Sequence, residues 1–522
     1  MSPDRPRWVV LKFGGTSVAS AERWAMIARV VRERVDEGLR PLVVHSAVAG
    51  VSNQLAAIVE AAPSGSGEDL VDAVIERHRA LAGELGVDTD ALLEAHFNEL
   101  KSLVEGMRLV HEASPAVHAR TMALGELMAT TLGAAHLKSQ GLDVHWLDAR
   151  EALQAEDVPG RSERAGLLSA TCAHRPDASL QGRLGKLDGV VLTQGFIASN
   201  ARGDTVLLGR GGSDTSAAYF AARLEAACCE IWTDVPGMFS ADPRIVPGAR
   251  LLKALRYEEA QEIASTGGSV LHPRSISPVR HAGIPLWVKD TARPDAAGTV
   301  ITAEAGDDAP RVKALSRRRG ITLVSMETFG MWQQVGFLAE AFRCFAELGL
   351  SIDLVSTSEG NVTVTLDPTA NAMDERMLER LTTELGRLCR VQVVPDVAVV
   401  SLVGQKVRAL LPQIGPALEV FQEHRIHLVS QAASDLNLSF VVDADQADRL
   451  VQNLHALLIN PPRADAVFGE TWQELAAPAE VTAGPPPWWI EKRSQLLDIA
   501  REHSSAYVYD LPTVTAAAGR LR

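Results

Sequence analysis

The stretch from residue 209 to 217, which reads GRGGSDTSA, combines three glycines, three hydroxyl residues and one pair of opposite charges. Glycines let backbone N–H groups approach an anion closely, and the small polar residues after them are typical of a helix N-terminus, where the dipole favours negative charge. We interpret Gly211, Gly212 and Ser213 as a phosphate-binding turn, with Arg210 and Asp214 as fixed charges beside it. An ordinary glycine-rich surface loop is the alternative.

A second glycine turn follows the first apolar segment of the chain, residues 8–11. Lys12 comes directly after this predicted strand, and Gly14, Gly15, Thr16 and Ser17 follow, with either Thr16 or Ser17 as the cap of an amphipathic helix. Ligands of an open α/β sheet bind at the carboxyl ends of its strands. Lys12 is therefore placed where an ammonium group can reach a phosphoryl group. A surface lysine at a strand end is the alternative.

These turns need a sheet that brings them together, and apolar segments recur along the first 300 residues. We predict further strands at 42–44, 144–147, 189–193 and 228–234, with helical segments between them. Alternating strands and helices are typical of an α/β protein with a mostly parallel sheet. The glycine turns are then expected at one edge of this sheet.

Three other polar side chains fall near the predicted strand ends or inside a helix. Ser46 and Ser52 lie in a small-residue loop after the second strand, where each can bind an anion or cap a helix. Glu126 lies in the apolar helical run 120–130, and a buried carboxylate needs a partner. That partner is either a substrate ammonium group or an arginine such as Arg120.

The predicted strand at 228–234 runs into a turn-rich loop. Thr233 and Asp234 can hydrogen-bond a ribose or a base, and Arg244 can donate two hydrogen bonds to a phosphate. A plain turn at Asp242-Pro243 is the alternative.

The composition excludes several classes of function. With 65 acidic and 51 basic residues the net charge is −14, which argues against nucleic acid or an anionic membrane as a partner. The five cysteines show neither C-x-x-C nor metal-binding spacing, so we expect reduced thiols in a cytoplasmic protein and no cysteine-bound metal. The chain of 522 residues is too long for one hydrophobic core, and no segment reads as a signal peptide or membrane span.

Four motifs, in this order, resemble those of the aspartate kinases. They are KFGGTS at 12–17, GEL at 125–127, LGRGGSD at 208–214 and WTDVPG at 232–237. The resemblance extends from about residue 7 to 470 and is to the lysine-sensitive type. It implies the α/β amino-acid-kinase fold, a mostly parallel sheet between helix layers. It also implies that ATP and Mg²⁺ are used to phosphorylate the side-chain carboxylate of L-aspartate, giving β-aspartyl phosphate.

The resemblance assigns roles to matching residues. Lys12 would stabilise the transferred phosphoryl group, and Asp214 would orient Lys12 and assist magnesium. Arg210 and Glu126 would bind the α-carboxylate and α-ammonium groups of aspartate. A carboxylate acceptor is already ionised at neutral pH, so no general base is required. The aspartate pocket is completed by Ser46 and Ser52.

Two of the implied nucleotide positions depart from the family. Ser269 stands in place of a lysine that contacts the phosphates, and Phe239 stands in place of a tyrosine. A missing cation at a developing charge costs on the order of a few kcal/mol. We therefore expect an active kinase with an altered ATP site, in which either Arg274 or Lys289 compensates or turnover is weak. The full set of nucleotide positions is Gly14, Gly15, Thr16, Gly211, Gly212, Ser213, Thr233, Asp234, Phe239, Arg244 and Ser269.

The second half of the chain contains an internal repeat. The tripeptide LVS at 354–356 recurs at 428–430, and the predicted strand at 362–367 has a counterpart at 438–443. Each copy reads as a ferredoxin-like unit. Two such units resemble tandem ACT domains, which bind amino acids at paired interfaces, whereas a purely structural dimerisation repeat is the alternative. We expect a kinase domain at 1–305, ACT domains at 306–394 and 395–475, and a homodimer or tetramer assembled through the ACT domains.

The resemblance places an effector site for L-lysine in the first repeat, and so implies feedback inhibition. Backbone groups near Gly336, at a helix N-terminus, suit the effector carboxylate, and Asp353 and Glu359 suit its ammonium groups. Gln333 replaces a histidine of the family. The implied positions are Met331, Gln333, Gln334, Gly336, Phe337, Leu338, Ser351, Ile352, Asp353, Thr357, Ser358 and Glu359.

Residues 476–522 contain a proline-rich linker and the sequence YVYD at 507–510. This ending resembles the start of diaminopimelate decarboxylase, which suggests the kinase part of a bifunctional protein. The segment is too short for the decarboxylase barrel, so we expect no decarboxylase activity from it. An ordinary C-terminal extension packed on the ACT pair is the alternative.

Two other functions compete with an active aspartate kinase. A lysine sensor with a weakly active kinase domain is suggested by Ser269. A kinase for a nucleoside monophosphate or acetylglutamate is disfavoured by Glu126 and the ACT pair.

Overall fold

The computed structural model describes residues 7–268, 270–304, 309–328, 335–368, 370–371, 373–410, 425–459, 465–476, 492–502, 510–511 and 515. The chain divides into two units, Met1–Gly469 and Glu470–Arg522. None of the helices described is long and apolar enough to cross a membrane.

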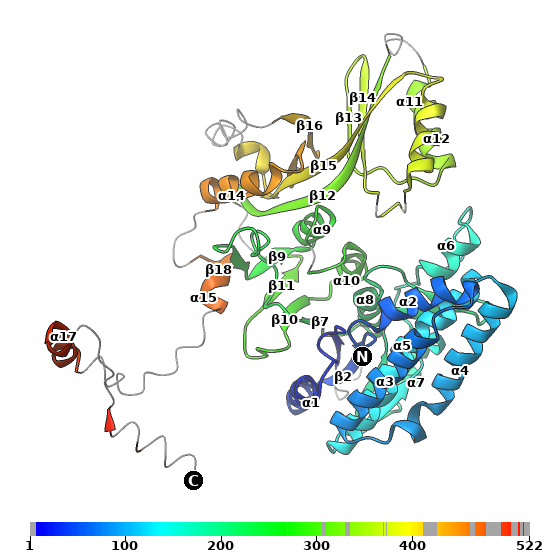
Figure 1. The fold of residues 1–522 in the computed structure, drawn as a ribbon, viewed down its shortest axis with the longest axis vertical. Helices are drawn as coiled ribbons and strands as arrows, with labels where there is room; N and C mark the ends of the chain where they lie inside the picture. Colours follow the sequence, from blue (N-terminus) through cyan, green and yellow to red (C-terminus); the bar gives the residue numbers. More distant parts are fainter. Residues whose placement is uncertain are drawn as a thin grey trace. The chain divides into compact units, whose positions relative to one another are not determined.

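Eight strands of the described chain form the central sheet of the first unit (Figure 1). Neighbouring strands are parallel, except that β10 and β11 are antiparallel. The predicted mostly parallel sheet is therefore confirmed. Its order is β3 (Val144–Leu147), β4 (Val190–Gln194), β2 (Arg40–His45), β1 (Trp8–Phe13), β7 (Cys228–Thr233), β10 (Leu286–Asp290), β11 (Thr299–Thr302) and β9 (Ala254–Arg256).

Helices cover this sheet because its central strands are apolar on both faces. All six residues of β1 are buried, as expected for a parallel strand packed on both sides. One group of helices is built on α8 (Gly212–Leu224), which contacts β1 and β7 and is flanked by α7 (Ala178–Leu184) and α10 (Ile276–Ala282). A second group contains α1 (Ala21–Asp36), α2 (Val51–Ala61), α3 (Glu68–Leu85), α4 (Thr89–Val110), α5 (Pro115–Ser139) and α6 (Glu163–Leu168).

The loops that the sequence singles out meet at one edge of the sheet. The parallel strands β1, β2, β4, β7 and β10 all end there, and backbone hydrogen bonds join the loops that follow them. Ser46 N–H donates to Phe13 O (3.2 Å), and Thr291 N–H donates to Thr233 O (2.8 Å). The hairpin of β5 (Ile197–Ser199) and β6 (Thr205–Leu207) follows β4 and leads into the glycine turn before α8.

A six-stranded sheet forms the other part of the first unit (Figure 1). Its two central strands, β12 (Arg311–Glu327) and β15 (Arg390–Gln405), are long and pair with each other along most of their length. Residues 321–327 of one long strand pair with 390–397 of the other, and residues 311–318 pair with 399–405. The two ferredoxin-like units are therefore interleaved, and the predicted boundary between 394 and 395 falls inside a continuous strand. The order is β13 (Val355–Thr357), β14 (Asn361–Leu366), β12, β15, β17 (Asn437–Asp443) and β16 (Ile426–Gln431).

Helices also cover the six-stranded sheet. The helices α11 (Phe337–Glu347) and α12 (Glu375–Leu385) bury apolar side chains such as Phe345 and Leu381 against β12 and β14. The helix α14 (Ala447–Leu458) packs on β12 and β15, and α9 (Tyr257–Ser265), which follows β9, also contacts both strands. The six-stranded sheet is thus packed directly against a helix of the first 300 residues.

The second unit begins at Glu470 and contains α15 (Trp472–Ala476) and α17 (Arg493–Glu502). An ion pair joins Lys492 Nζ to Asp510 Oδ1 at 2.7 Å. Residues 507–509 of the decarboxylase-like sequence lie outside the described residues.

Candidate active site

A buried ion pair joins the two glycine turns. Lys12 Nζ lies 2.6 Å from Asp214 Oδ1, and the two side chains are 11% and 13% exposed. Lys12 comes from the end of β1 and Asp214 from the first turn of α8. Burying two charges is costly even when they are paired, so this pair is more typical of a functional site than of a stabilising contact. The predicted juxtaposition of the two residues is found.

The glycines at the start of α8 are required by close packing. Gly211 is the N-cap, with φ of 68°, and a Cβ there would overlap the ring of His272. A Cβ on Gly212 would lie 2.6 Å from Phe196 Cδ2. The first N–H groups of a helix have no partners within the helix. Small residues thus keep this positive helix end beside the Lys12–Asp214 pair.

The glycine turn after β1 is open toward Lys12. A Cβ on Gly14 would lie 3.5 Å from Lys12 Nζ, whereas one on Gly15 would lie 2.7 Å from Ala47 O. The prediction that Thr16 or Ser17 caps the following helix is wrong, because Ser20 is the N-cap and accepts a hydrogen bond from Arg23 N–H. The chain needs a longer turn than the sequence suggests, and the side chain of Thr16 is exposed.

Glu126 is a buried carboxyl group that lacks a cation among the described residues. Its Oε1 accepts a hydrogen bond from Ala47 N–H at 3.2 Å, and its buried Oε2 has no hydrogen-bond partner in the described chain. Burial raises the pKa of Glu126 to about 8. The alternative of a salt bridge to Arg120 is wrong, because Arg120 pairs with Glu99 at 2.6 Å. The site is thus suited to an incoming ammonium group.

The two predicted serines and Arg210 differ in their surroundings. Ser46 and Ser52 are half-buried, the first beside Ala47 and the second in the first turn of α2. Arg210 is exposed and forms no ion pair within the part of the chain that the structure describes. A guanidinium in this state is suited to an anionic ligand.

Sequence reasoning gave no role to two histidines of this edge. His45 ends β2, is fully buried, and contacts Ser46 O through Nδ1 at 2.9 Å; burial lowers its pKa to about 4. His272 packs on Gly211, and its Nδ1 accepts a hydrogen bond from Arg274 N–H at 3.2 Å. Both neutral rings support backbone turns of the site. Tertiary packing buries His45 and half-buries His272, and the sequence signal for each was its place beside a predicted loop.

The predicted nucleotide residues form a less compact group. Thr233 Oγ1 donates to Asp234 Oδ1 at 3.2 Å, and Asp234 is exposed. Phe239 is buried and bridges to Leu251 on β8 (Arg250–Leu252). Arg244 is 81% exposed, and Asp242 holds its guanidinium at 2.7 Å. Arg244 is therefore placed by a neighbouring carboxylate.

The two cations considered as replacements for the missing lysine have different roles. Ser269 itself lies outside the described residues. Arg274 donates to Leu208 O at 2.6 Å and to Ala170 O at 2.7 Å, so its guanidinium is used to hold the chain before the glycine turn. Lys289 Nζ lies 5.3 Å from the centre of the Trp232 ring, next to the loop after β7. The ammonium group of Lys289 thus lies over tryptophan rings of β7 and β10, since it is also 5.5 Å from the centre of the Trp287 ring.

The predicted effector positions lie around the start of α11 and the β13 edge. Gly336 is the N-cap of α11, with φ of 98°. Asp353 is paired with Arg318 of β12 at 3.1 Å, and burial raises the pKa of this aspartate. Phe337 is buried, Ile352 is partly buried in the same core, and Leu338, Ser351, Thr357, Ser358 and Glu359 are exposed. Met331, Gln333 and Gln334 lie outside the described residues.

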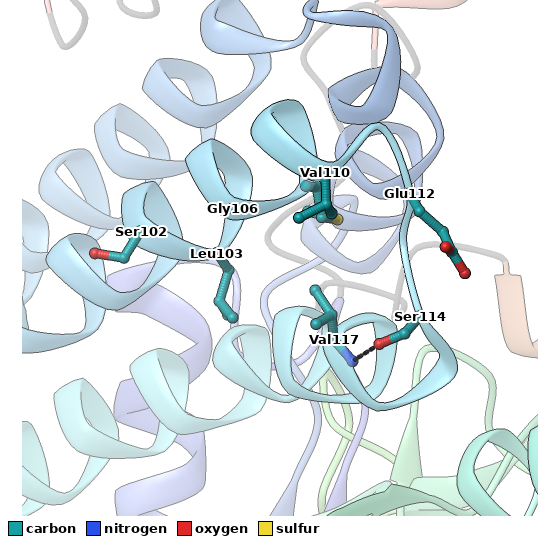
Figure 2. A pocket seen from close by; sticks show the side chains of 8 residues that line it. Ser102, Leu103, Gly106, Val110, Glu112, Ser114 and Val117 are labelled. Atoms are coloured by element: carbon teal, nitrogen blue, oxygen red, sulfur yellow. Dashed lines mark hydrogen bonds between the residues drawn. The ribbon is translucent and has the colours of Figure 1, made fainter.

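A cavity of about 310 Å³ lies between α4 and the start of α5 (Figure 2). Figure 2 shows Val110 and Val117 beside the N-terminal turn of α5, where Ser114 accepts a hydrogen bond from Val117 N–H. No predicted site residue lines this cavity. Its lining residues are Ser102, Leu103, Gly106, Met107, Val110, Glu112, Ser114 and Val117.

Comparison with known proteins identifies the family. The amino acid kinase family matches residues 7–290. The lysine-sensitive aspartokinase 3 of Escherichia coli is 36% identical over 460 residues, which cover 86% of this chain and 99% of that protein.

Solved structures of the E. coli aspartokinase III give the same result. The complex with aspartate and ADP (R-state) has a TM-score of 0.74 at 33% identity and covers 87% of this chain and 100% of that chain. The complex with lysine and aspartate (T-state) has a TM-score of 0.69 at 33% identity and covers 87% and 99%. The fold and these similarities agree: the chain belongs to the amino acid kinase family and, within it, to the aspartokinases.

Proposed function

We propose that the protein transfers the γ-phosphoryl group of ATP to the side-chain carboxylate of L-aspartate, giving β-aspartyl phosphate. The observation that carries the proposal is the buried Lys12–Asp214 pair, 2.6 Å apart, at the start of α8. Phosphoryl transfer depends on positioning and charge stabilisation rather than on a protein nucleophile. The E. coli relative has been solved with aspartate and ADP, which supports the same substrates here.

The charges of the site have complementary roles in this reaction. The Lys12 ammonium group lies where the transferred phosphoryl group gains negative charge, and Asp214 holds that ammonium group in place. Backbone N–H groups at Gly211 to Ser213 add the positive end of α8. Mg²⁺, when bound with ATP, neutralises phosphate charge. In the described residues no three His, Cys, Asp or Glu side chains form a metal cluster, and Asp214 with the phosphates fits the usual binding of this ion.

The aspartate pocket is proposed at the loop after β2. Glu126 Oε2 is buried without a hydrogen-bond partner in the described chain, so an α-ammonium group would satisfy it. Arg210 is the exposed cation suited to the α-carboxylate, and the half-buried hydroxyl groups of Ser46 and Ser52 would complete the pocket. In the proposed complex the side-chain carboxylate of aspartate would face Lys12.

We also propose feedback inhibition by L-lysine at the β13 edge of the six-stranded sheet, in a homodimer or tetramer formed through this sheet. The lysine complex of the E. coli relative supports the effector. Asp353 and Glu359 supply carboxylates, and the N-terminus of α11 supplies backbone donors. A lysine sensor with weak kinase activity is the second candidate, because Ser269 replaces a lysine of the family.

Two finer proposals concern the context of the chain. We propose that it works in the cytoplasm, because its five cysteines show no disulfide or metal spacing and the described ones are free thiols. We also propose that it is the kinase part of a bifunctional protein with diaminopimelate decarboxylase, on the resemblance of residues 506–510. Mass determination of the protein purified from its source would test the second proposal, and a mass of 56.0 kDa would contradict it.

A coupled assay of ADP release tests the main proposal. With MgATP, ADP release should depend on L-aspartate and should fall as L-lysine is added. Aspartate-independent or absent ADP release would contradict kinase activity. Lysine binding without turnover would instead favour the sensor.

A further inference from the structure

Ser240 follows Phe239 directly in the proposed nucleotide loop and is completely buried. Its backbone N–H donates to Arg250 O at 2.8 Å, and its carbonyl oxygen accepts from Leu315 N–H at 2.7 Å. Its Oγ accepts from Arg250 N–H at 2.8 Å and lies 2.8 Å from His455 Nε2. One residue of the loop is thus held by four hydrogen bonds from three separate elements.

Two of these elements belong to the six-stranded sheet and its helix. Leu315 lies on β12, and His455 lies in the last turn of α14. Ser240 Oγ and His455 Nε2 share one hydrogen bond, and a hydroxyl group that accepts the Arg250 N–H can be either its donor or its acceptor. Burial lowers the pKa of His455 to about 4, so the ring is neutral at physiological pH.

The same segment of β12 is fixed on its other side to α9. Lys313 Nζ pairs with Glu259 at 2.6 Å with both side chains fully buried, and Ser316 Oγ donates to Thr266 Oγ1 at 2.6 Å. A few residues further along β12, Arg318 pairs with the proposed effector carboxylate Asp353. A single continuous strand therefore contacts the nucleotide loop, α9 and the proposed effector site.

We propose that Ser240 is a positioning residue through which the six-stranded sheet sets the affinity of the nucleotide loop for ATP. This inference rests on the proposed function and specifies how the regulatory sheet acts on it. A shift of β12 or α14 changes the position of Ser240, and with it Phe239 and the Asp242–Arg244 pair. Bound lysine then changes the affinity for ATP by the same factor as bound ATP changes the affinity for lysine, because one coupling free energy links the two sites.

Two substitutions remove the contact from opposite sides. Ser240→Ala removes the hydroxyl group from the nucleotide loop, and His455→Leu removes the imidazole ring from α14 without touching the kinase residues. For both we expect a KM for ATP raised about 5-fold to 20-fold, within the usual range of allosteric coupling. The kcat and the KM for aspartate should change less than about twofold, and the lysine concentration for half-inhibition should rise by a similar factor.

Ser401→Ala is the matched control. Ser401 Oγ and Ser439 Oγ form a buried hydrogen bond of 2.7 Å inside the six-stranded sheet. The control therefore loses a buried hydroxyl group of the same kind without altering the nucleotide loop, and it should lower the melting temperature while leaving the KM for ATP unchanged.

Calorimetric binding of ADP to the full chain separates this inference from the proposed function. If the parent protein shows no aspartate-dependent turnover, the proposed function fails, and weaker ADP binding by both variants still supports Ser240 as a positioning residue. If both variants are less stable but bind ADP and lysine as the parent does, Ser240 is merely structural and the inference is overturned. Should Ser240→Ala not fold, His455→Leu decides between these results.

Discussion

Lys12 and Asp214 show how far residue-level reasoning reaches. Both could be predicted from the sequence. Lys12 lies at the end of a strand and Asp214 at the start of a helix, and in a parallel sheet such positions meet at the carboxyl edge, where ligands bind. His45 and His272 could not be predicted in the same way, because nothing local in the sequence says that their rings pack against Trp24 and Gly211, respectively. The missing partner of Glu126 is likewise visible only in three dimensions.

Replacing Lys12 by methionine tests the charge at the transferred group. The variant keeps most of the side-chain volume but removes the ammonium group, so kcat should fall by about 10²-fold to 10³-fold. The KM for aspartate should change little. Steady-state ADP release measures both, and the exposed Lys101→Met serves as the control. A variant that retains more than a tenth of the parent kcat would remove Lys12 from the catalytic role.

Glu126 predicts a pH effect on aspartate binding. Its pKa of about 8 in the free protein means that the carboxyl group is mostly protonated at pH 7. Pairing with the ammonium group of aspartate requires the carboxylate, so binding at pH 7 should release about one proton, and the KM for aspartate should fall as pH rises toward 8.

Calorimetry in buffers of different ionisation enthalpy measures this proton. Glu126→Gln should abolish the release and weaken aspartate binding, whereas Glu99→Gln, which alters an exposed ion pair, should do neither. Proton release that persists in Glu126→Gln would assign it to another group.

At the scale of elements, the loops at the sheet edge were easier to predict than the two strands that run through both ferredoxin-like units. The sequence repeat suggests two consecutive ferredoxin-like units, because similar segments recur at a nearly constant spacing. The structure instead runs β12 and β15 through both units, and β-bulges or irregularities near Arg318 and Ile321 divide β12 between them. Strand pairing over such distances depends on packing partners that a periodicity in the chain does not encode.

The turn before α8 makes a prediction about Gly211. Gly211→Ala meets both a positive φ, which costs about 1–2 kcal/mol, and the ring of His272, which adds about 1–3 kcal/mol for overpacking. Gly160 has a similar φ of 81°, but a Cβ there would meet no atom within 4 Å. Gly160→Ala should therefore lower the free energy of unfolding only by the cost of the positive φ. Chemical denaturation measures the difference, and kinase activity should fall only in Gly211→Ala. Equal losses of stability would contradict the packing role of His272.

At the scale of the whole molecule, the proposed assembly places the six-stranded sheet at the interface between copies. Val355 on the edge strand β13 is 41% exposed and lies between the proposed effector residues Asp353 and Thr357. Val355→Asp should therefore convert the oligomer to a smaller species in light scattering and weaken lysine inhibition. Val35→Asp, at a position of 42% exposure on α1, is the matched control and should leave the mass unchanged. An unchanged mass for Val355→Asp would place the interface elsewhere.

The overall division of the chain was predictable in outline. The composition and the four motifs indicate the α/β fold and its order, and the repeat indicates the regulatory part. The contacts of β12 with α9 and with Ser240 were not predictable, because they join residues far apart in sequence whose types, such as serine and leucine, carry no signal of their own. These contacts pack the two predicted parts of residues 1–469 together.

Identification of the product tests the central claim most directly. The protein is incubated with MgATP, L-aspartate and hydroxylamine, which traps an acyl phosphate as a hydroxamate. The account predicts the β-hydroxamate of aspartate, formed in step with ADP, suppressed by L-lysine and nearly absent in Lys12→Met. ADP release without an aspartyl hydroxamate, or the same yield from Lys12→Met, would contradict it.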